Sequence, residues 1–156
     1  MNTVVSTLTQ WNTLGSGITE LIVPSNSLND VSLTVLDLTR FKRLKKIVIG
    51  DECFIHVEEV KMIGLSELRS VVIGMNSFTQ HKNDYGYDPN RHFYLKNCPK
   101  LKSLKMGRFS FSDYTVCEID NVDALEVIEM GELSELSEIF LYASTMELKS
   151  ILIHSE

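Results

Sequence analysis

Six segments of the chain repeat one spacing of apolar positions. Each has an aliphatic or methionine side chain at its first, fourth and sixth positions, in the sequences ITELIVP, LKKIVIG, LRSVVIG, LKSLKMG, LEVIEMG and LKSILIH. They begin at Ile18, Leu44, Leu68, Leu101, Leu125 and Leu148. Successive starts are therefore 26, 24, 33, 24 and 23 residues apart. Because repeats of this length bury their apolar faces by stacking on their neighbours, the pattern predicts one continuous core.

Two further features recur within each unit. A larger apolar residue follows ten positions after four of the starts, at Leu28, Phe54, Phe78 and Phe111. A second apolar segment with two-residue alternation, typical of a strand with one buried face, includes Leu36 and Leu38, Val60 and Met62, Phe93 and Leu95, and Cys117 and Ile119. Four first segments end in glycine, which fits a tight bend. Each unit thus predicts a strand, a bend, a turn, a second strand and a return turn.

The frame L-x-x-L-x-(I/L/M)-G with a period of 23–26 residues resembles a leucine-rich repeat. The elements IGMNSF at 73–78, MGRFSF at 106–111 and NCPKL at 97–101 are similar to the BspA-like repeats of bacterial and protist proteins. The resemblance covers about 18–153 and implies a mainly β, right-handed leucine-rich-repeat solenoid of about six repeats, with parallel strands stacked into sheets and little helix. The Asn of the usual N-x-L step is absent, which favours a flat, strand-rich solenoid. Such repeats mostly bind other proteins.

The expected organisation is a single domain over 1–156. Residues 18–153 form the repeats, and residues 1–17 lie outside the pattern. Val4, Val5, Leu8 and Trp11 favour an N-terminal cap over the first repeat, or a degenerate preceding repeat. The sequence stops directly after an apolar segment, so either the natural chain continues or this open C-terminal repeat self-associates.

The third unit is nine residues longer than its 24-residue neighbours, and the extra residues lie within 79–92, TQHKNDYGYDPNRH. This inserted loop is either a plain solvated insertion or a contact loop for a partner, in which Tyr85, Tyr87 and Arg91 are the candidate residues. His81, Asp84, Asp88 and His92 are potential metal ligands, but their spacing matches no known site, so we predict no metal.

The outward positions of the first strands suggest a binding face. The third and fifth positions point away from the core if the first, fourth and sixth point inward. Ile22, Val48 and Val72 occupy the fifth position of three successive units, and Lys46 and Lys105 border them. This apolar stripe is either ordinary strand chemistry or a surface that binds a partner.

Charge and length exclude some classes of function. The net charge of −6 disfavours binding to nucleic acid or to an anionic membrane, and no apolar run approaches the roughly 18 residues that span a bilayer. Lys42, Arg43, Lys45 and Lys46 form a basic cluster that is either a solvated turn or a site for an anion or acidic partner. The fifth unit carries an acidic stripe, either solvated or a patch for a basic partner, at Glu126, Glu129, Glu132, Glu135 and Glu138.

No motif in the sequence predicts catalysis or a cofactor. The three cysteines, Cys53, Cys98 and Cys117, include no C-x-x-C pair, and their odd number favours a reduced, intracellular compartment. Cys117 aligns with buried positions, and Cys53 stands where other units have serine. We therefore expect a non-catalytic protein–protein interaction module whose partner is a protein of unknown identity. The alternatives are a structural or adhesive segment of a longer cell-surface array and, less favoured, an enzyme that uses the inserted loop.

Overall fold

The strands of this protein lie in two parallel sheets. The computed structural model describes residues 2–80, 88–131 and 150–153. The described part is mainly β, with a single short helix. Its elements are β1 (Asn2–Val4), α1 (Leu8–Asn12), β2 (Glu20–Val23), β3 (Val35–Asp37), β4 (Lys46–Ile49), β5 (Glu59–Ile63), β6 (Ser70–Ile73), β7 (Asp88–Lys96), β8 (Ser103–Met106), β9 (Tyr114–Asp120), β10 (Val127–Met130) and β11 (Ser150–Ile153).

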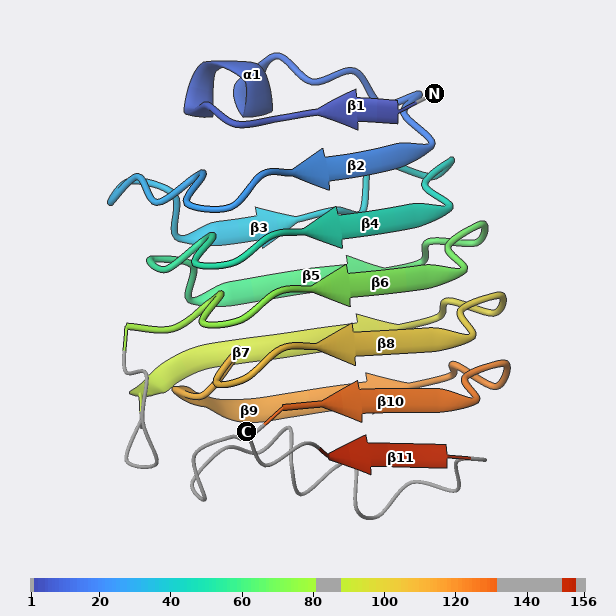
Figure 1. Ribbon diagram of the computed structural model, residues 1–156. Helices are drawn as coiled ribbons and strands as arrows, with labels where there is room; N and C mark the ends of the chain where they lie inside the picture. Colours follow the sequence, from blue (N-terminus) through green and yellow to red (C-terminus); the bar gives the residue numbers. More distant parts are fainter. Residues whose placement is uncertain (1, 81–87, 132–149, 154–156) are drawn as a thin grey trace.

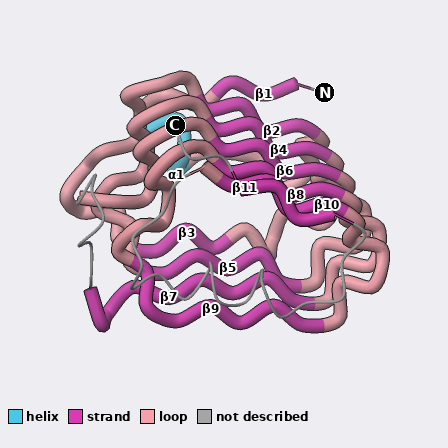
Figure 2. The backbone as a smooth tube through the Cα atoms, turned by 60° about the horizontal axis from the view of Figure 1, so that its bottom comes forward, coloured by secondary structure: helices cyan, strands magenta, loops and turns pink. Residues whose placement is uncertain are grey.

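From β2 to β10 the chain alternates between the two sheets. The seven-stranded sheet has the order β1-β2-β4-β6-β8-β10-β11, and the four-stranded sheet has the order β3-β5-β7-β9. Every recorded pairing of neighbouring strands is parallel. The two sheets form two layers joined by turns on both sides, and their strands run in opposite directions (Figures 1 and 2). Strands at equivalent places in successive units therefore become neighbours in one sheet.

The register of the seven-stranded sheet confirms the predicted inward positions. The fourth positions of successive units pair directly, as in Leu21 with Ile47 and Val71 with Leu104. In the first five units the first, fourth and sixth positions are all buried, whereas the fifth positions are partly or fully exposed. The inward side chains join those of the four-stranded sheet in one cluster, as two-residue alternation requires. The core thus lies between the two layers.

The predicted anchors form a stack of aromatic rings. Phe54 and Phe78 lie 5.1 Å apart between ring centroids at 16°, and Phe78 and Phe111 lie 4.5 Å apart at 9°. All three are fully buried and have positive φ values of 55°, 59° and 61°. Positive φ is rare for a bulky residue because its Cβ is crowded by the backbone. Leu28, at the same place in the first unit, has a φ of 60°, so one strained turn recurs in four units.

Close contact between successive bends explains the glycines that end the first strands. A Cβ added to Gly107 would lie 2.6 Å from the carbonyl carbon of Gly74, and one added to Gly131 would lie 2.5 Å from Cα of Arg108. Neither glycine has a positive φ. Glycine is needed at these places because a side chain would collide with the backbone of the preceding unit.

A serine ladder connects the strained turns. The Ser77 hydroxyl accepts from the Cys53 amide at 3.1 Å and donates to the Gly50 carbonyl at 2.8 Å. Ser110 repeats this arrangement one unit further on, accepting from the Ser77 amide and donating to the Gly74 carbonyl. Cys53 occupies the equivalent position, and its thiol contacts the Pro24 carbonyl oxygen at 3.1 Å. The thiol therefore replaces a ladder hydroxyl, and burial raises its pKa.

The N-terminal segment contains a strand followed by a short helix. Strand β1 pairs with β2 and extends the sheet as a degenerate unit would. Helix α1 follows, and its start has a capping box between Thr7 and Gln10. Trp11 is buried, with ring centroids 5.8 Å from Phe41 and 6.5 Å from Phe54. The helix therefore packs its tryptophan against Phe41 and Phe54 of the core.

Candidate functional site

The outer face of the seven-stranded sheet carries a column of aliphatic side chains. Val4 pairs in register with Ile22, Ile22 with Val48, and Val48 with Val72. Val4 is 56% exposed, and the other three are partly exposed. Equivalent residues on neighbouring parallel strands lie about 4.8 Å apart, so these four side chains form one continuous strip. We name Val4, Ile22, Val48 and Val72 the aliphatic column.

Val4 is a member of this column that the sequence prediction missed. Residues 1–17 lack the full repeat pattern, so the sequence predicts for them only a cap or a degenerate repeat. The signal that could have placed it is the dipeptide Val4-Val5, in which Val5 is 1% exposed. The same exposed-then-buried pair of aliphatics occurs at the fifth and sixth positions of the next three units, for example Ile22-Val23.

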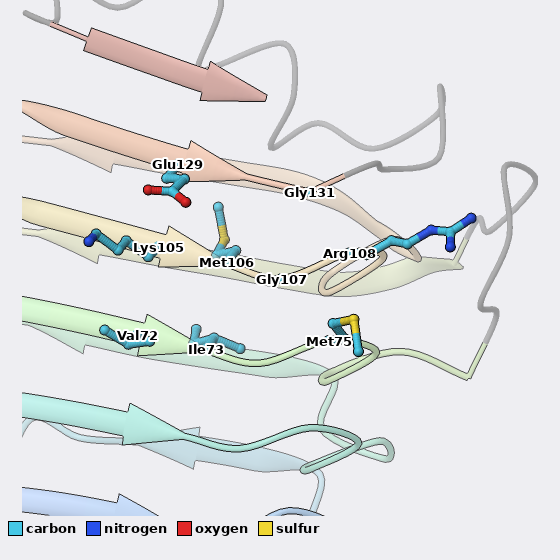
Figure 3. A pocket seen from close by; sticks show the side chains of 9 residues that line it. All are labelled: Val72, Ile73, Met75, Lys105, Met106, Gly107, Arg108, Glu129 and Gly131. Carbon is cyan, nitrogen blue, oxygen red and sulfur yellow. The ribbon is translucent and has the colours of Figure 1, made fainter. Parts of the chain in front are cut away.

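The aliphatic column runs into a hollow at the carboxyl ends of β6, β8 and β10. The hollow has a volume of about 390 Å³, and Figure 3 shows the side chains around it. Its lining includes Val72, Met75, Lys105, Met106, Arg108 and Glu129. Met75 is 45% exposed at the bend, so its flexible thioether is accessible to a ligand. The column and the hollow together make a largely apolar surface with charged residues at one end.

The charges around the hollow have defined positions. Lys105 continues the line of the aliphatic column on β8 and pairs in register with Glu129 on β10. The Arg108 guanidinium lies 4.8 Å from the centroid of the Phe109 ring, a cation–π contact that orients it. Two cations and one carboxylate thus border the hollow, which favours a ligand with an acidic group next to an apolar one.

Five of the predicted contact residues share this face. Ile22, Val48 and Val72 belong to the aliphatic column, while the exposed Lys46 and Lys105 lie on β4 and β8. They belong to one surface because they lie on the outer face of the same sheet, on strands that pair in register. Whether they bind a partner stays a prediction. Tyr85 and Tyr87 lie outside the described residues.

The structure corrects the placement of Arg91. Strand β7 begins at Asp88, so residues 88–92 of the expected loop 79–92 belong to the four-stranded sheet. The Arg91 side chain is only 2% exposed, and its Nε lies 3.2 Å from Asp88 and 3.9 Å from Asp113. Its Nη1 donates to the carbonyls of Val57 and Phe78. Arg91 is therefore a buried structural residue and is not available as a surface contact.

Asp113 holds both described ends of the insertion. Its carboxylate accepts from the Thr79 hydroxyl and, at 2.9 Å, from the amide of Gln80. Its carbonyl accepts from the amide of Asp88 at 2.9 Å. Asp113 is 1% exposed, so these bonds and the nearby Arg91 satisfy a buried charge.

The potential metal ligands of the insertion are not gathered in the described chain. His81 and Asp84 lie outside the described residues. Asp88 pairs with Arg91, and the His92 ring nitrogens lie 3.0 Å from the Tyr94 hydroxyl and 3.3 Å from the Pro89 carbonyl. Among the residues that the structure describes, no group of three or more His, Cys, Asp or Glu side chains is placed to hold a metal ion. All three cysteines are buried free thiols.

Comparisons with known proteins give no relative. The chain matches no protein-family model, no curated protein and no solved structure. The described helix is too short to cross a membrane. Of the acidic stripe, only Glu126 and Glu129 are among the described residues, and both lie in the fifth unit, Glu129 on β10 and Glu126 directly before it. The site must therefore be interpreted from its own geometry.

Proposed function

We propose that this chain is a right-handed leucine-rich-repeat solenoid, similar to BspA-like repeats, that acts as a non-catalytic protein-binding scaffold. The solenoid is supported by the pairing of equivalent positions: Leu21 meets Ile47, 26 residues later, and Ile47 meets Val71, 24 residues later. It is further supported by the alternation of successive strands between two sheets. Repeats that stack in this way present equivalent surfaces side by side.

The aliphatic column carries the proposal of protein binding. Four outward aliphatic side chains in register form an apolar strip on a chain of which 23% of the residues are charged. A contiguous apolar strip on an otherwise polar surface, next to charged residues, is typical of a protein interface. Because the strip is built on hydrogen-bonded strands, its side chains lose little backbone freedom when a partner binds.

The surface also indicates the chemistry of the partner. An apolar ridge on the partner would cover the aliphatic column, and an apolar side chain at its end would enter the hollow beside Met75. An acidic group close to that side chain would meet Lys105 and Arg108. Exclusion of water by the surrounding apolar contacts strengthens such a charge pair.

The decisive experiment compares two double substitutions in a capture assay. Val48→Glu/Val72→Glu places two charges in the aliphatic column, whereas Val31→Glu/Val35→Glu makes the same change at aliphatics away from this face, which are 75% and 45% exposed. Immobilised wild-type protein and both variants are incubated with lysate of the source cells, and bound proteins are quantified by mass spectrometry. Circular dichroism and thermal melts verify that all three are folded.

The proposal expects a specific partner that the wild type and Val31→Glu/Val35→Glu retain and that Val48→Glu/Val72→Glu loses. Equal capture by all three proteins would exclude the aliphatic column as the binding face. The contribution of the insertion is tested separately with Tyr85→Ser/Tyr87→Ser. A deletion of the whole insertion is unsuitable, because it would remove Arg91 and leave the Asp113 carboxylate without its buried cation.

A further inference from the structure

A second surface, apart from the aliphatic column, concentrates positive charge on this acidic protein. Lys45, Arg69 and Lys102 occupy the same place in three successive units, directly before strands β4, β6 and β8. Their backbones form one ladder: the Arg69 amide donates to the Lys45 carbonyl at 2.8 Å, and the Lys102 amide donates to the Arg69 carbonyl at 2.9 Å. The backbones of these three residues are thus about 4.8 Å apart from one unit to the next, although the residues are 24 and 33 positions apart in sequence.

Other cations extend this line into a patch. We name the whole set the basic edge; its members are all exposed, and they are Arg43, Lys45, Lys46, Arg69, Lys100 and Lys102. It lies at the amino ends of the strands of the seven-stranded sheet, where the arrows of β4, β6 and β8 begin in Figure 1. Within the described chain no carboxylate forms an ion pair with Lys45, Arg69 or Lys102, whereas Glu67 pairs with Lys100 at 3.0 Å.

The arrangement brings three like charges to neighbouring strands. Like charges directly opposite each other on neighbouring strands repel. The positive charge of the patch affects the carboxylate of Glu67: its pKa is lowered, mainly by the hydrogen bond and charge of Lys100 and further by the charges of Arg69 and Lys45. A bound group of opposite charge would relieve the repulsion among the cations.

The basic edge contains a hollow, and its row of cations ends after three strands. A depression of about 400 Å³ is lined by Arg69, Pro99, Lys100, Lys102 and Ala124, so its cations surround apolar surface. The ladder of cations is flanked by Thr19 before Lys45 and by Glu126 after Lys102. The positive strip therefore crosses only three strands, and a long polyanion would also meet the net negative charge of the rest of the chain.

We propose that the basic edge binds a short acidic peptide segment of a partner protein, with its carboxylates on Lys45, Arg69 and Lys102 and one apolar side chain in the hollow at Pro99. An extended segment of about four residues spans the roughly 10 Å from the first of these strands to the third. The proposed contacts at Lys45, Arg69, Lys102 and Pro99 include no member of the aliphatic column, so the two proposals can be tested separately.

Fluorescence anisotropy with a labelled peptide tests this assignment. The probe is a glutamate-rich peptide of about eight residues with one central phenylalanine, and its control has glutamine in place of every glutamate. Lys45→Gln/Lys102→Gln is compared with Lys61→Gln/Lys96→Gln, which removes the same charge on the four-stranded sheet, where each lysine pairs with a glutamate. Thermal melts verify folding.

The wild type is expected to bind the acidic probe and not its glutamine control, with an affinity that falls between about 50 mM and about 200 mM salt. Lys45→Gln/Lys102→Gln should weaken binding about three- to tenfold, while Lys61→Gln/Lys96→Gln and Val48→Glu/Val72→Glu stay within about twofold of the wild type. Absence of saturable binding below about 1 mM, or an equal loss in both lysine variants, would overturn the proposal. So would tighter binding of a single-stranded oligonucleotide or of anionic vesicles at the same residues.

Discussion

Arg91 and Asp113 form an ion pair in the interior of the protein, with side chains that are 2% and 1% exposed and with Nε 3.9 Å from Oδ2. The two residues come from different units, on either side of the seven-stranded sheet's strand β8 in sequence. A buried charge is tolerated only when its partner and its hydrogen bonds remain in place. This pair therefore makes the base of the insertion sensitive to single substitutions.

Substitution Arg91→Ala should lower the free energy of unfolding by about 3–5 kcal/mol, because it leaves the Asp113 carboxylate buried without its cation. The measurement is urea denaturation followed by circular dichroism. Lys61→Ala is the matched control, since its pair with Glu59 is exposed at 37% and 35% and its loss should change the free energy of unfolding very little. Similar losses in the two variants would show that the Arg91 pair is solvated.

Because the turns have positive φ values, a glycine substitution there should destabilise the protein less than an alanine substitution. Phe78→Ala should cost about 3–5 kcal/mol through loss of the stacked ring. Phe78→Gly removes more of the side chain but relieves the positive φ of 59°, so it should be about 0.5–1 kcal/mol less destabilising than Phe78→Ala. Denaturant unfolding of both variants gives the difference. A more stable alanine variant would mean that this backbone conformation carries no strain.

The crowded bend at Gly107 predicts a large effect from one methyl group. Gly107→Ala should destabilise the protein by about 1–3 kcal/mol, since its Cβ would meet the Gly74 backbone at 2.6 Å. Gly15→Ala has nothing within 4 Å of the added Cβ and should be neutral or stabilising by up to about 1 kcal/mol. Melting temperatures of the two variants make the comparison, and equal values would contradict the close approach of the bends.

The serine ladder predicts that Cys53 is replaceable by the residue found in other units. Cys53→Ser should remain within about 1 kcal/mol of the wild type, because a hydroxyl can donate to the Pro24 carbonyl in place of the thiol. Ser77→Ala should cost about 1–3 kcal/mol, since it removes the acceptor for the Cys53 amide and the donor to the Gly50 carbonyl. If Ser77→Ala were as stable as the wild type, the ladder would not hold the turns together.

The alternation of apolar residues carried most of the fold prediction. Leu104 and Met106 are buried on β8 with Lys105 exposed between them, because successive side chains of a strand point to opposite faces. Helix α1 is not predicted by the apolar pattern, because its five residues are too few to show a helical period, and the spacing of Thr7 and Gln10 as a capping box is its only local signal.

The errors and omissions concern contacts between units. The polar composition of residues 79–92 predicts that they are exposed to solvent. The residues around Arg91 in the sequence do not indicate that it pairs with the buried carboxylate of Asp113 from the next unit. The basic edge has a similar origin. Lys45, Arg69 and Lys102 are separate in the sequence, and they become neighbours only through the register of the sheet. Their shared place, directly after the first leucine of each unit, was the available signal.

Because Asp113 binds the amides of both Gln80 and Asp88, the two described ends of the insertion are fastened to one residue of the following unit. The units before and after this point pair directly with each other through β6 and β8. The position between Gln80 and Asp88 is thus an acceptor site for grafting. A peptide epitope or recognition sequence of another length can be introduced there, because Asp113 forms hydrogen bonds to the residues at both of its ends.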